Sequence, residues 1–390
     1  MVLVFLVLAA SRQVEATEPR LDRDGERLER ILEEQVDVVD TSELEAILED
    51  LNRRMEGYLP QVTLGGILDM LRGGESAFKP RELVEGLLRY FFREVVASSK
   101  LLGELVILAI VAAFLQNLQA AFENETLGRL ASTVVYLVLI ALAMSGFILA
   151  MRSAREVVGG LVTFMLALIP LLITLLVGNG ALLSAGLFHP LMIFITHATG
   201  IIVMDLVFPL IFFSAVLEVV SRLSESFSVS RLAVLVRQGG VAVLGLFLSI
   251  FLGVMAVQGA AASVADGVTV RTAKFLSAAF VPVVGKMFSD AVEVVIGSSL
   301  LLKNVIGVAG VAVIFLIAAF PLLKILSVVF IYRLGAALIQ PLGAGKLVDC
   351  LSGLADALVM LLVATLAVVV MFFLAVTMVV GAGNAAVMLR

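Results

Sequence analysis

Two aspartates are the residues of this sequence best placed to do chemistry, because both lie in stretches rich in apolar residues. Asp205 lies within GIIVMDLVFPLIFF, and Asp356 follows Ser352-Gly353 at the start of another apolar run. An ionised Asp in hydrocarbon costs about 3 kcal/mol on insertion scales, so it should face protein or water. Asp205 is therefore a candidate proton, ion or pore position, and equally a candidate helix–helix contact. Asp356 also fits a simple carboxylate near a helix N-terminus.

Four prolines form a second pattern. Residues 170–191 (PLLITLLVGNGALLSAGLFHPL) and 321–342 (PLLKILSVVFIYRLGAALIQPL) align without a gap at an offset of 151 and share 10 identities. The same offset pairs Asp205 with Asp356. The pattern predicts helix breaks at Pro170, Pro190, Pro321 and Pro341, and a duplicated helix–break–helix unit over 152–220 and 303–371. Shared apolar composition is the alternative explanation. Broken segments at matching positions in two halves indicate a pathway or binding site in transporter-like folds.

Other kinds of site have little support in the sequence. There is no Walker motif, no nucleophile–base pair and no metal-ligand spacing. The chain has two His and one Cys, which leaves little material for a metal site or a disulfide framework. We therefore expect no enzyme activity, no metal and no cofactor.

The elements that must position these residues follow from the composition. Of 390 residues, 61% are apolar and 15% are charged. A soluble domain is nearer half apolar and a quarter charged, so a soluble monomer is excluded. The sequence predicts an all-α, polytopic membrane protein with a small helical extramembrane region at its N-terminus.

The charge is unevenly distributed along the chain. Residues 1–16 have the length and small-residue pattern of a signal peptide; an apolar helix packed on the membrane domain is the alternative. Residues 17–100 carry 12 basic and 19 acidic side chains, a net −7 that argues against nucleic acid as a partner. We expect short helices there, one starting at a capping box formed by Ser42 and Glu45, and an interfacial helix over 80–100. Residues 101–390 are the multispanning domain, for which we expect about seven or eight spans.

The clearest spans are each close to the ~20 residues that a bilayer core requires. They are 104–122, 131–151, 157–177, 200–220, 239–258, 305–323 and 358–380, and the stretches 181–199, 268–303 and 325–347 are less regular. Orientation stays open. A cleaved signal peptide with strict alternation places Arg152 and Arg155 outside the cytoplasm, whereas the positive-inside rule prefers them inside, with the arginines of 221–237.

Two stretches carry a resemblance to a known family. GYLPQVTLGGILDMLRGG (57–74) precedes the membrane region, and RTAKFLSAAFVPVVGKMFSDAVEVVIGSSLLLKN (271–304) lies within it. With the order of segments, they make the whole chain similar to the stage III sporulation protein AE family of endospore-forming Firmicutes. The resemblance implies a multi-pass protein of the mother-cell membrane around the forespore. It also implies partners: the other proteins of the stage III sporulation operon and, through them, stage II sporulation protein Q.

Two functions follow from these patterns. The resemblance implies a scaffold or pore subunit of a channel-like secretion complex, needed for endospore development and late forespore sigma-factor activity. The alternative is a self-contained secondary transporter or permease in which the repeat, Asp205 and Asp356 form the pathway.

Overall fold

The computed structural model describes residues 42–55, 63, 80–121, 125–178, 181–223, 229–280 and 284–388. For the helical residues 42–44, 54–55, 80–81, 115–121, 125–132, 223, 262–280, 284–302, 304 and 382–388 it describes the backbone alone. The predicted signal peptide, residues 1–16, lies outside the described residues, as does most of the acidic stretch 17–79. Every element in the described part of the chain is a helix, which confirms the all-α class.

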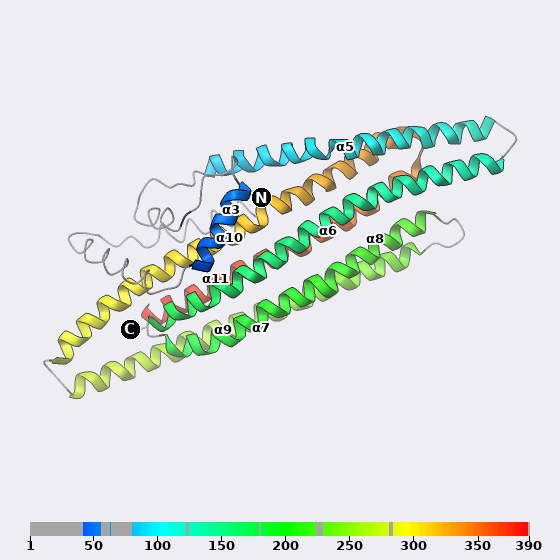
Figure 1. The fold of residues 1–390 in the computed structure, drawn as a ribbon. Coiled ribbons are helices and arrows are strands. Elements are labelled where there is room, and N and C mark those ends of the chain that lie inside the picture. Colours follow the sequence, from blue (N-terminus) through cyan, green and yellow to red (C-terminus); the bar gives the residue numbers. More distant parts are fainter. Residues whose placement is uncertain are drawn as a thin grey trace.

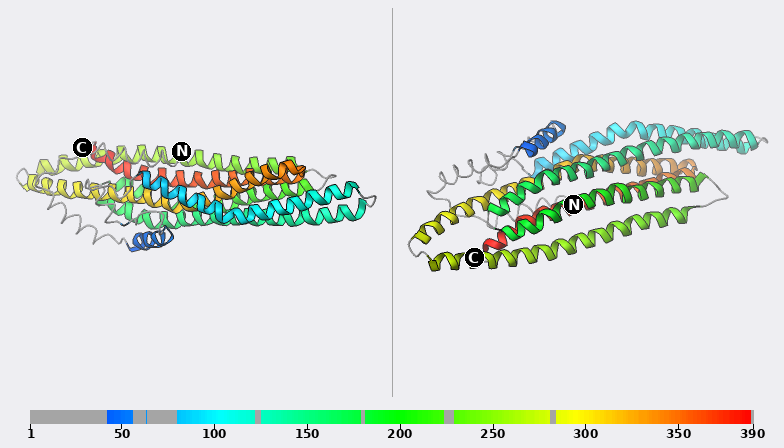
Figure 2. Two further views of the ribbon diagram at one scale, coloured as in Figure 1. Left: turned by 90° about the horizontal axis from the view of Figure 1, so that it is seen from above. Right: turned by 60° about the horizontal axis from the view of Figure 1, so that its bottom comes forward.

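The helices form one elongated bundle in which successive long helices run in alternating directions (Figures 1 and 2). A short helix, α3, precedes the long ones and begins at Ser42, where the capping box predicts a helix start. α7, η1 and α8 follow one another without a turn and act as one long helix. The bounds are α3 Ser42–Met55, α5 Pro80–Ala121, α6 Glu125–Gly178, α7 Leu182–Ile201, η1 Ile202–Val207, α8 Phe208–Leu223, α9 Ser230–Phe280, α10 Val284–Ile339, η2 Gln340–Leu342 and α11 Gly345–Met388.

Six helical stretches of the described chain are long and apolar enough to cross a membrane, fewer than the seven clear spans expected. The expected spans 131–151 and 157–177 are two halves of one helix, α6, which continues through Arg152 and Arg155. Likewise the expected interfacial helix 80–100 and the span from 104 belong to one helix, α5. The charges at 152–156 suggested a loop between two spans. They lie instead within a continuous helix, and neighbouring helices pack against α6 both before and after these residues.

Close packing between the long helices depends on small residues. A Cβ on Gly307 would come within 2.5 Å of Val380, and one on Gly310 within 2.9 Å of Leu168. Small residues let membrane helices approach closely, which replaces the hydrophobic driving force that lipid removes. Tyr332 of α10 is fully buried, and its hydroxyl donates a hydrogen bond to the carbonyl of Ala143 on α6. α10 is therefore tightly held between α6 and α11.

Three of the four prolines lie inside continuous helices, so the helix breaks expected there are not found. Pro170 is inside α6, Pro190 inside α7 and Pro321 inside α10. Proline is tolerated in long membrane helices because neighbouring helices and local adjustments compensate for the missing N–H donor. Pro341 differs: it lies in the short 3-10 turn η2, and Gly343 then adopts a left-handed φ of 79° that ends the segment.

The helix boundaries also bear on the proposed duplication. Under the offset of 151, the end of α6 at Gly178 corresponds to residue 329 and the start of α7 at Leu182 to residue 333, and both of these lie inside α10. The turn between α10 and α11 corresponds to 189–193, inside α7. An ungapped repeat of one helix–break–helix unit is therefore not what the boundaries show. Duplication in a looser sense stays a prediction, for which superposition of 152–220 on 303–371 is the test.

Candidate functional site

A group of four charged residues lies at mid-length in the bundle, and we call it the central layer. It consists of Arg152, Arg155 and Glu156 of α6 and Asp205 of η1, and all four side chains are exposed. Arg155 contacts the residue next to Asp205 in sequence, donating a hydrogen bond from Nη2 to the carbonyl oxygen of Met204 at 3.1 Å. The four residues therefore lie at nearly the same height along the bundle.

The hydrogen bond from Arg155 has a specific cause in the sequence. η1 is a π-helix, in which each N–H bonds the carbonyl five residues earlier, and the Phe208 N–H donates to the Val203 carbonyl. In that register the donor for the next carbonyl, Met204, would be residue 209. Residue 209 is proline, which has no N–H. Arg155 supplies the donor that Pro209 cannot, which ties α6 to η1 at the level of Asp205.

The central layer interrupts helices that are otherwise apolar for more than one bilayer thickness. The apolar stretch Thr133–Gly178 has 46 residues, about 69 Å of helix, whereas the hydrocarbon core of a bilayer is about 30 Å thick. Each exposed charge would cost about 3 kcal/mol if it faced hydrocarbon at the membrane centre. Part of this surface must therefore be covered by something other than lipid tails.

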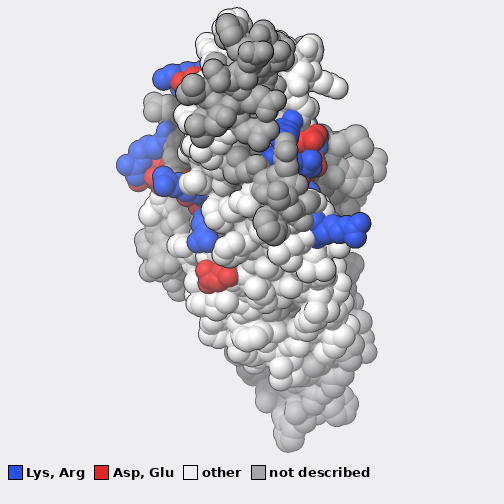
Figure 3. Space-filling model, turned by 90° about the vertical axis from the view of Figure 1, so that its right-hand side faces the viewer, with Lys and Arg blue, Asp and Glu red and all other residues white. Residues whose placement is uncertain are grey.

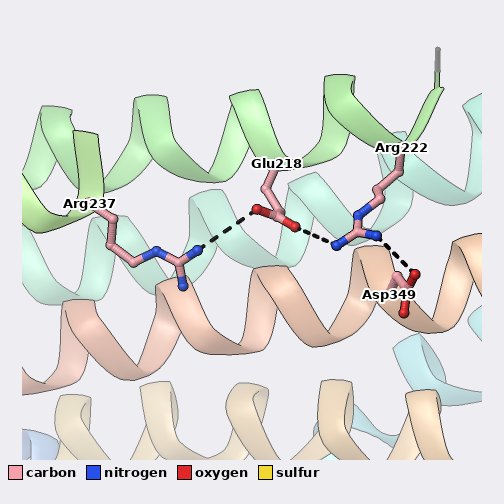
Figure 4. A network of polar contacts seen from close by, with 4 residues as sticks. All are labelled: Glu218, Arg222, Arg237 and Asp349. Carbon is pink, nitrogen blue, oxygen red and sulfur yellow. Dashed lines mark hydrogen bonds and ion pairs between the residues drawn. The ribbon is translucent and has the colours of Figure 1, made fainter. Parts of the chain in front are cut away.

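A second group, the end network, joins α8, α9 and α11 near the C-terminal end of α8 and the N-terminal ends of α9 and α11 (Figure 4). Arg222 lies between two carboxylates, 2.9 Å from Oε1 of Glu218 and 2.9 Å from Oδ2 of Asp349. Arg237 approaches Oε2 of Glu218 to 3.8 Å. Both oxygens of Glu218 are therefore paired with arginines, and the carboxylate is buried, with only 8% of its side chain exposed. Figure 3 views the bundle from this end and shows most of the charged side chains in the upper part of the view and few in the lower part.

Gly353 on α11 makes room for the buried carboxylate. A Cβ at this position would lie 2.5 Å from Cγ of Glu218 and 3.1 Å from its Cδ. Contacts under 3 Å are essentially never seen for real Cβ atoms, so α11 needs glycine here for Glu218 to lie across it. Glycine and carboxylate thus form one packed unit that fixes α8 against α11.

The two predicted aspartates are in different places. Asp356 forms an ion pair with Arg333 of α10 at 2.6 Å, with both side chains about half exposed. Their heights can be compared along α6. The residue before Arg333, Tyr332, bonds the carbonyl of Ala143, so Asp356 lies near the level of Ala143. Asp205 lies at the level of Glu156. Thirteen residues of α6 separate these levels, about 20 Å along the axis. Asp205 and Asp356 therefore do not form one site.

Several residues of these groups escaped the sequence reasoning. Pro209 was not among the four prolines, although its position four residues after Asp205 is a readable signal of a missing donor. Glu218 lies near the end of an expected span, and its two arginine partners come from contacts that a single sequence does not contain. Lys303 is fully buried, and no hydrogen bond joins its Nζ to a described residue. The described residues include no cluster of three or more His, Cys, Asp or Glu that could hold a metal.

The comparisons with known proteins identify the family. The sequence profile of the stage III sporulation protein AE family matches residues 62–383. The stage III sporulation protein AE of Bacillus subtilis strain 168 is 41% identical over 384 residues, covering 98% of this chain and 95% of that protein. The chain belongs to the stage III sporulation protein AE family.

Family membership confirms the resemblance and gives the chain a role in sporulation. The six long apolar helices make this family member a multi-pass membrane protein. The family is named for a stage of spore development rather than for a reaction. No solved structure matches the chain.

Proposed function

We propose that this stage III sporulation protein AE family member is an integral membrane subunit of a channel-like secretion complex. The complex lies between mother cell and forespore and sustains endospore development and late forespore sigma-factor activity. The protein would reside in the mother-cell membrane that surrounds the forespore. The observation that carries the proposal, beside the family, is a long bundle whose surface bears an exposed charged layer between two apolar halves. Such a surface suits a protein that is surrounded by other proteins as well as by lipid.

The partners that we propose are the other proteins of the stage III sporulation operon and, through them, stage II sporulation protein Q. Two features of the structure support contacts with other proteins. The α5–α6 hairpin exposes large apolar side chains, including Ile107 at 63% and Phe114 at 61%. The first turns of α5 expose both apolar and charged residues, such as Phe92 at 62% and the pair of Arg89 with Glu85.

A self-contained transporter is the second candidate, and the π-helical segment around Asp205 favours it, because π-bulges occur frequently at functional sites. The placement of the aspartates favours the subunit instead. Asp205 and Asp356 lie about 20 Å apart along the axis, and Asp356 is paired with Arg333. One pocket of about 130 Å³ between α5, α10 and α11 is lined by Leu87, Phe315 and other apolar residues, and it joins neither aspartate.

Two measurements separate the candidates. The full-length protein, purified alone and reconstituted into liposomes, is tested for uptake of protons, sodium and small anions. It is then affinity-purified from sporulating cells in mild detergent, and the co-purifying operon proteins are identified. The subunit role predicts silence in liposomes and recovery of the other operon proteins. Flux that Asp205→Asn abolishes, without co-purifying partners, would establish the transporter. Silence together with no partner would reject both.

A further inference from the structure

Charged residues of the central layer are exposed on the surface of the bundle where α6 and α7 meet. Arg152 and Glu156 project from α6 and Asp205 from η1, all exposed. One to two turns further along α6, Thr163 is exposed and Gly159 has nothing within 4 Å of where a Cβ would be. We call these five residues the α6–α7 face.

Two contacts show that the charges of the two helices project on the same side. Arg155 meets Met204, and Val162 comes within 3.3 Å of a Cβ on Gly200, so α6 and α7 are adjacent and antiparallel. On α6, Arg152 and Glu156 lie one turn apart on an exposed strip beside Arg155. On α7 and η1, Ile201 and Asp205 likewise lie one turn apart on an exposed strip. Viewed from one end, successive residues wind clockwise around one of two antiparallel helices and anticlockwise around the other. Both exposed strips therefore lie on the same side of the line of contact between α6 and α7.

The charges of this face have no partner within the described chain. The neighbouring Arg155 donates its hydrogen bond to the Met204 carbonyl. No ion pair or hydrogen bond joins Arg152, Glu156 or Asp205 to another described residue. The central layer has two cations and two anions within about 6 Å of height, so its net charge is zero. The α6–α7 face itself carries one of these cations, Arg152, and both anions, Glu156 and Asp205, at one height, so the cation of one copy can meet a carboxylate of another.

We propose that the α6–α7 face binds the same face of a second copy of this chain. Copies inserted in the same direction have their central layers at the same height. A twofold axis along the bundle places α6 of one copy opposite η1 of the other, so Arg152 faces Asp205 of the second copy, twice. Gly159 lets the two backbones approach. The inference concerns self-association and does not depend on the proposed role in secretion.

Cysteine cross-linking in native membranes tests the contact. The chain has one cysteine, Cys350, which is buried, so Cys350→Ala gives a clean background. Thr163→Cys and Ile201→Cys report on the face, and Leu246→Cys of α9, an exposed residue away from it, is the matched control. With a short bifunctional maleimide, the two reporters are expected to give dimers and Leu246→Cys none.

Charge inversion then tests the pairing. In the Thr163→Cys background, Arg152→Asp alone and Asp205→Arg alone place like charges opposite one another, and each is expected to lower dimer yield about tenfold. The double inversion restores opposite charges and is expected to recover the yield. The same inversions of Arg333 and Asp356, an exposed pair elsewhere in the bundle, are expected to leave it unchanged.

Three results would overturn the proposal. One is labelling of Thr163→Cys by a membrane-impermeant maleimide without any dimer, which would place the face in water. Another is neither labelling nor dimer, which would place it against lipid or a different protein. The third is a dimer whose yield the inversions leave unchanged, or one that the double inversion fails to restore. Intact folding of each variant is checked by elution as a single species in detergent.

Discussion

The central layer and the end network contain the same residue types in opposite arrangements. Each has two arginines and two carboxylates on neighbouring helices. In the end network, Glu218 is buried and paired with both arginines, and Asp349 pairs with one of them. In the central layer every side chain is exposed, and the one described bond goes to a backbone carbonyl. The difference separates charges that hold one chain together from charges left for contacts outside it.

The largest effect is expected from Glu218→Ala. It leaves Arg237, with 17% of its side chain exposed, and Arg222 without their shared carboxylate, and breaking a buried pair from one side costs about 3–5 kcal/mol. The free energy of unfolding in mixed detergent micelles measures it. Asp205→Ala is the matched control and should change it by less than about 0.5 kcal/mol. Equal losses in the two variants would remove the distinction between the groups.

Gly353→Ala should destabilise by about 1–3 kcal/mol, because the new methyl overlaps Cγ of Glu218. In a Glu218→Ala background the obstruction is gone, so the same change should cost much less. A double-mutant cycle on the same unfolding assay gives the coupling between the two positions. Additive losses would show that Glu218 does not lie across Gly353.

Arg155→Met should cost about 0.5–1.5 kcal/mol, because it removes the side-chain hydrogen bond that the Met204 carbonyl accepts. Pro209→Ala supplies an N–H at the position where the helix lacks one. Arg155→Met should therefore be nearly neutral in the Pro209→Ala background. An undiminished loss in that background would mean that Arg155 acts in another way, such as through its charge.

The smallest effect on unfolding is expected from Asp356→Asn. Its pair with Arg333 is about half exposed, and such surface pairs contribute about 0–1 kcal/mol. The loss should shrink further at high salt, which screens exposed pairs. A loss comparable with that of Glu218→Ala would show that exposure does not distinguish the two kinds of pair.

The sequence predicted the helical membrane class and the turn at Pro341, because composition and the following Gly343 determine both locally. It overestimated the number of spans, because Arg152, Arg155 and Glu156 have the composition of a loop while tertiary packing keeps them helical. It identified Asp205 and Asp356 as isolated acids in apolar surroundings. It did not find that Arg333 pairs with Asp356 or that Arg237 pairs with Glu218, since those partners are brought together only by the fold.

The uninterrupted course of α6 has a consequence for topology. If 131–151 and 157–177 were separate spans, every later loop would change sides. As one crossing, α6 leaves an even number of alternating helices, so Pro80 and Met388 lie at the same end of the bundle. Arg222, Arg237 and Lys346 lie towards the other end of the bundle. A reporter fused after Arg390 would therefore show on which side of the membrane the end of the bundle with Pro80 and Met388 lies.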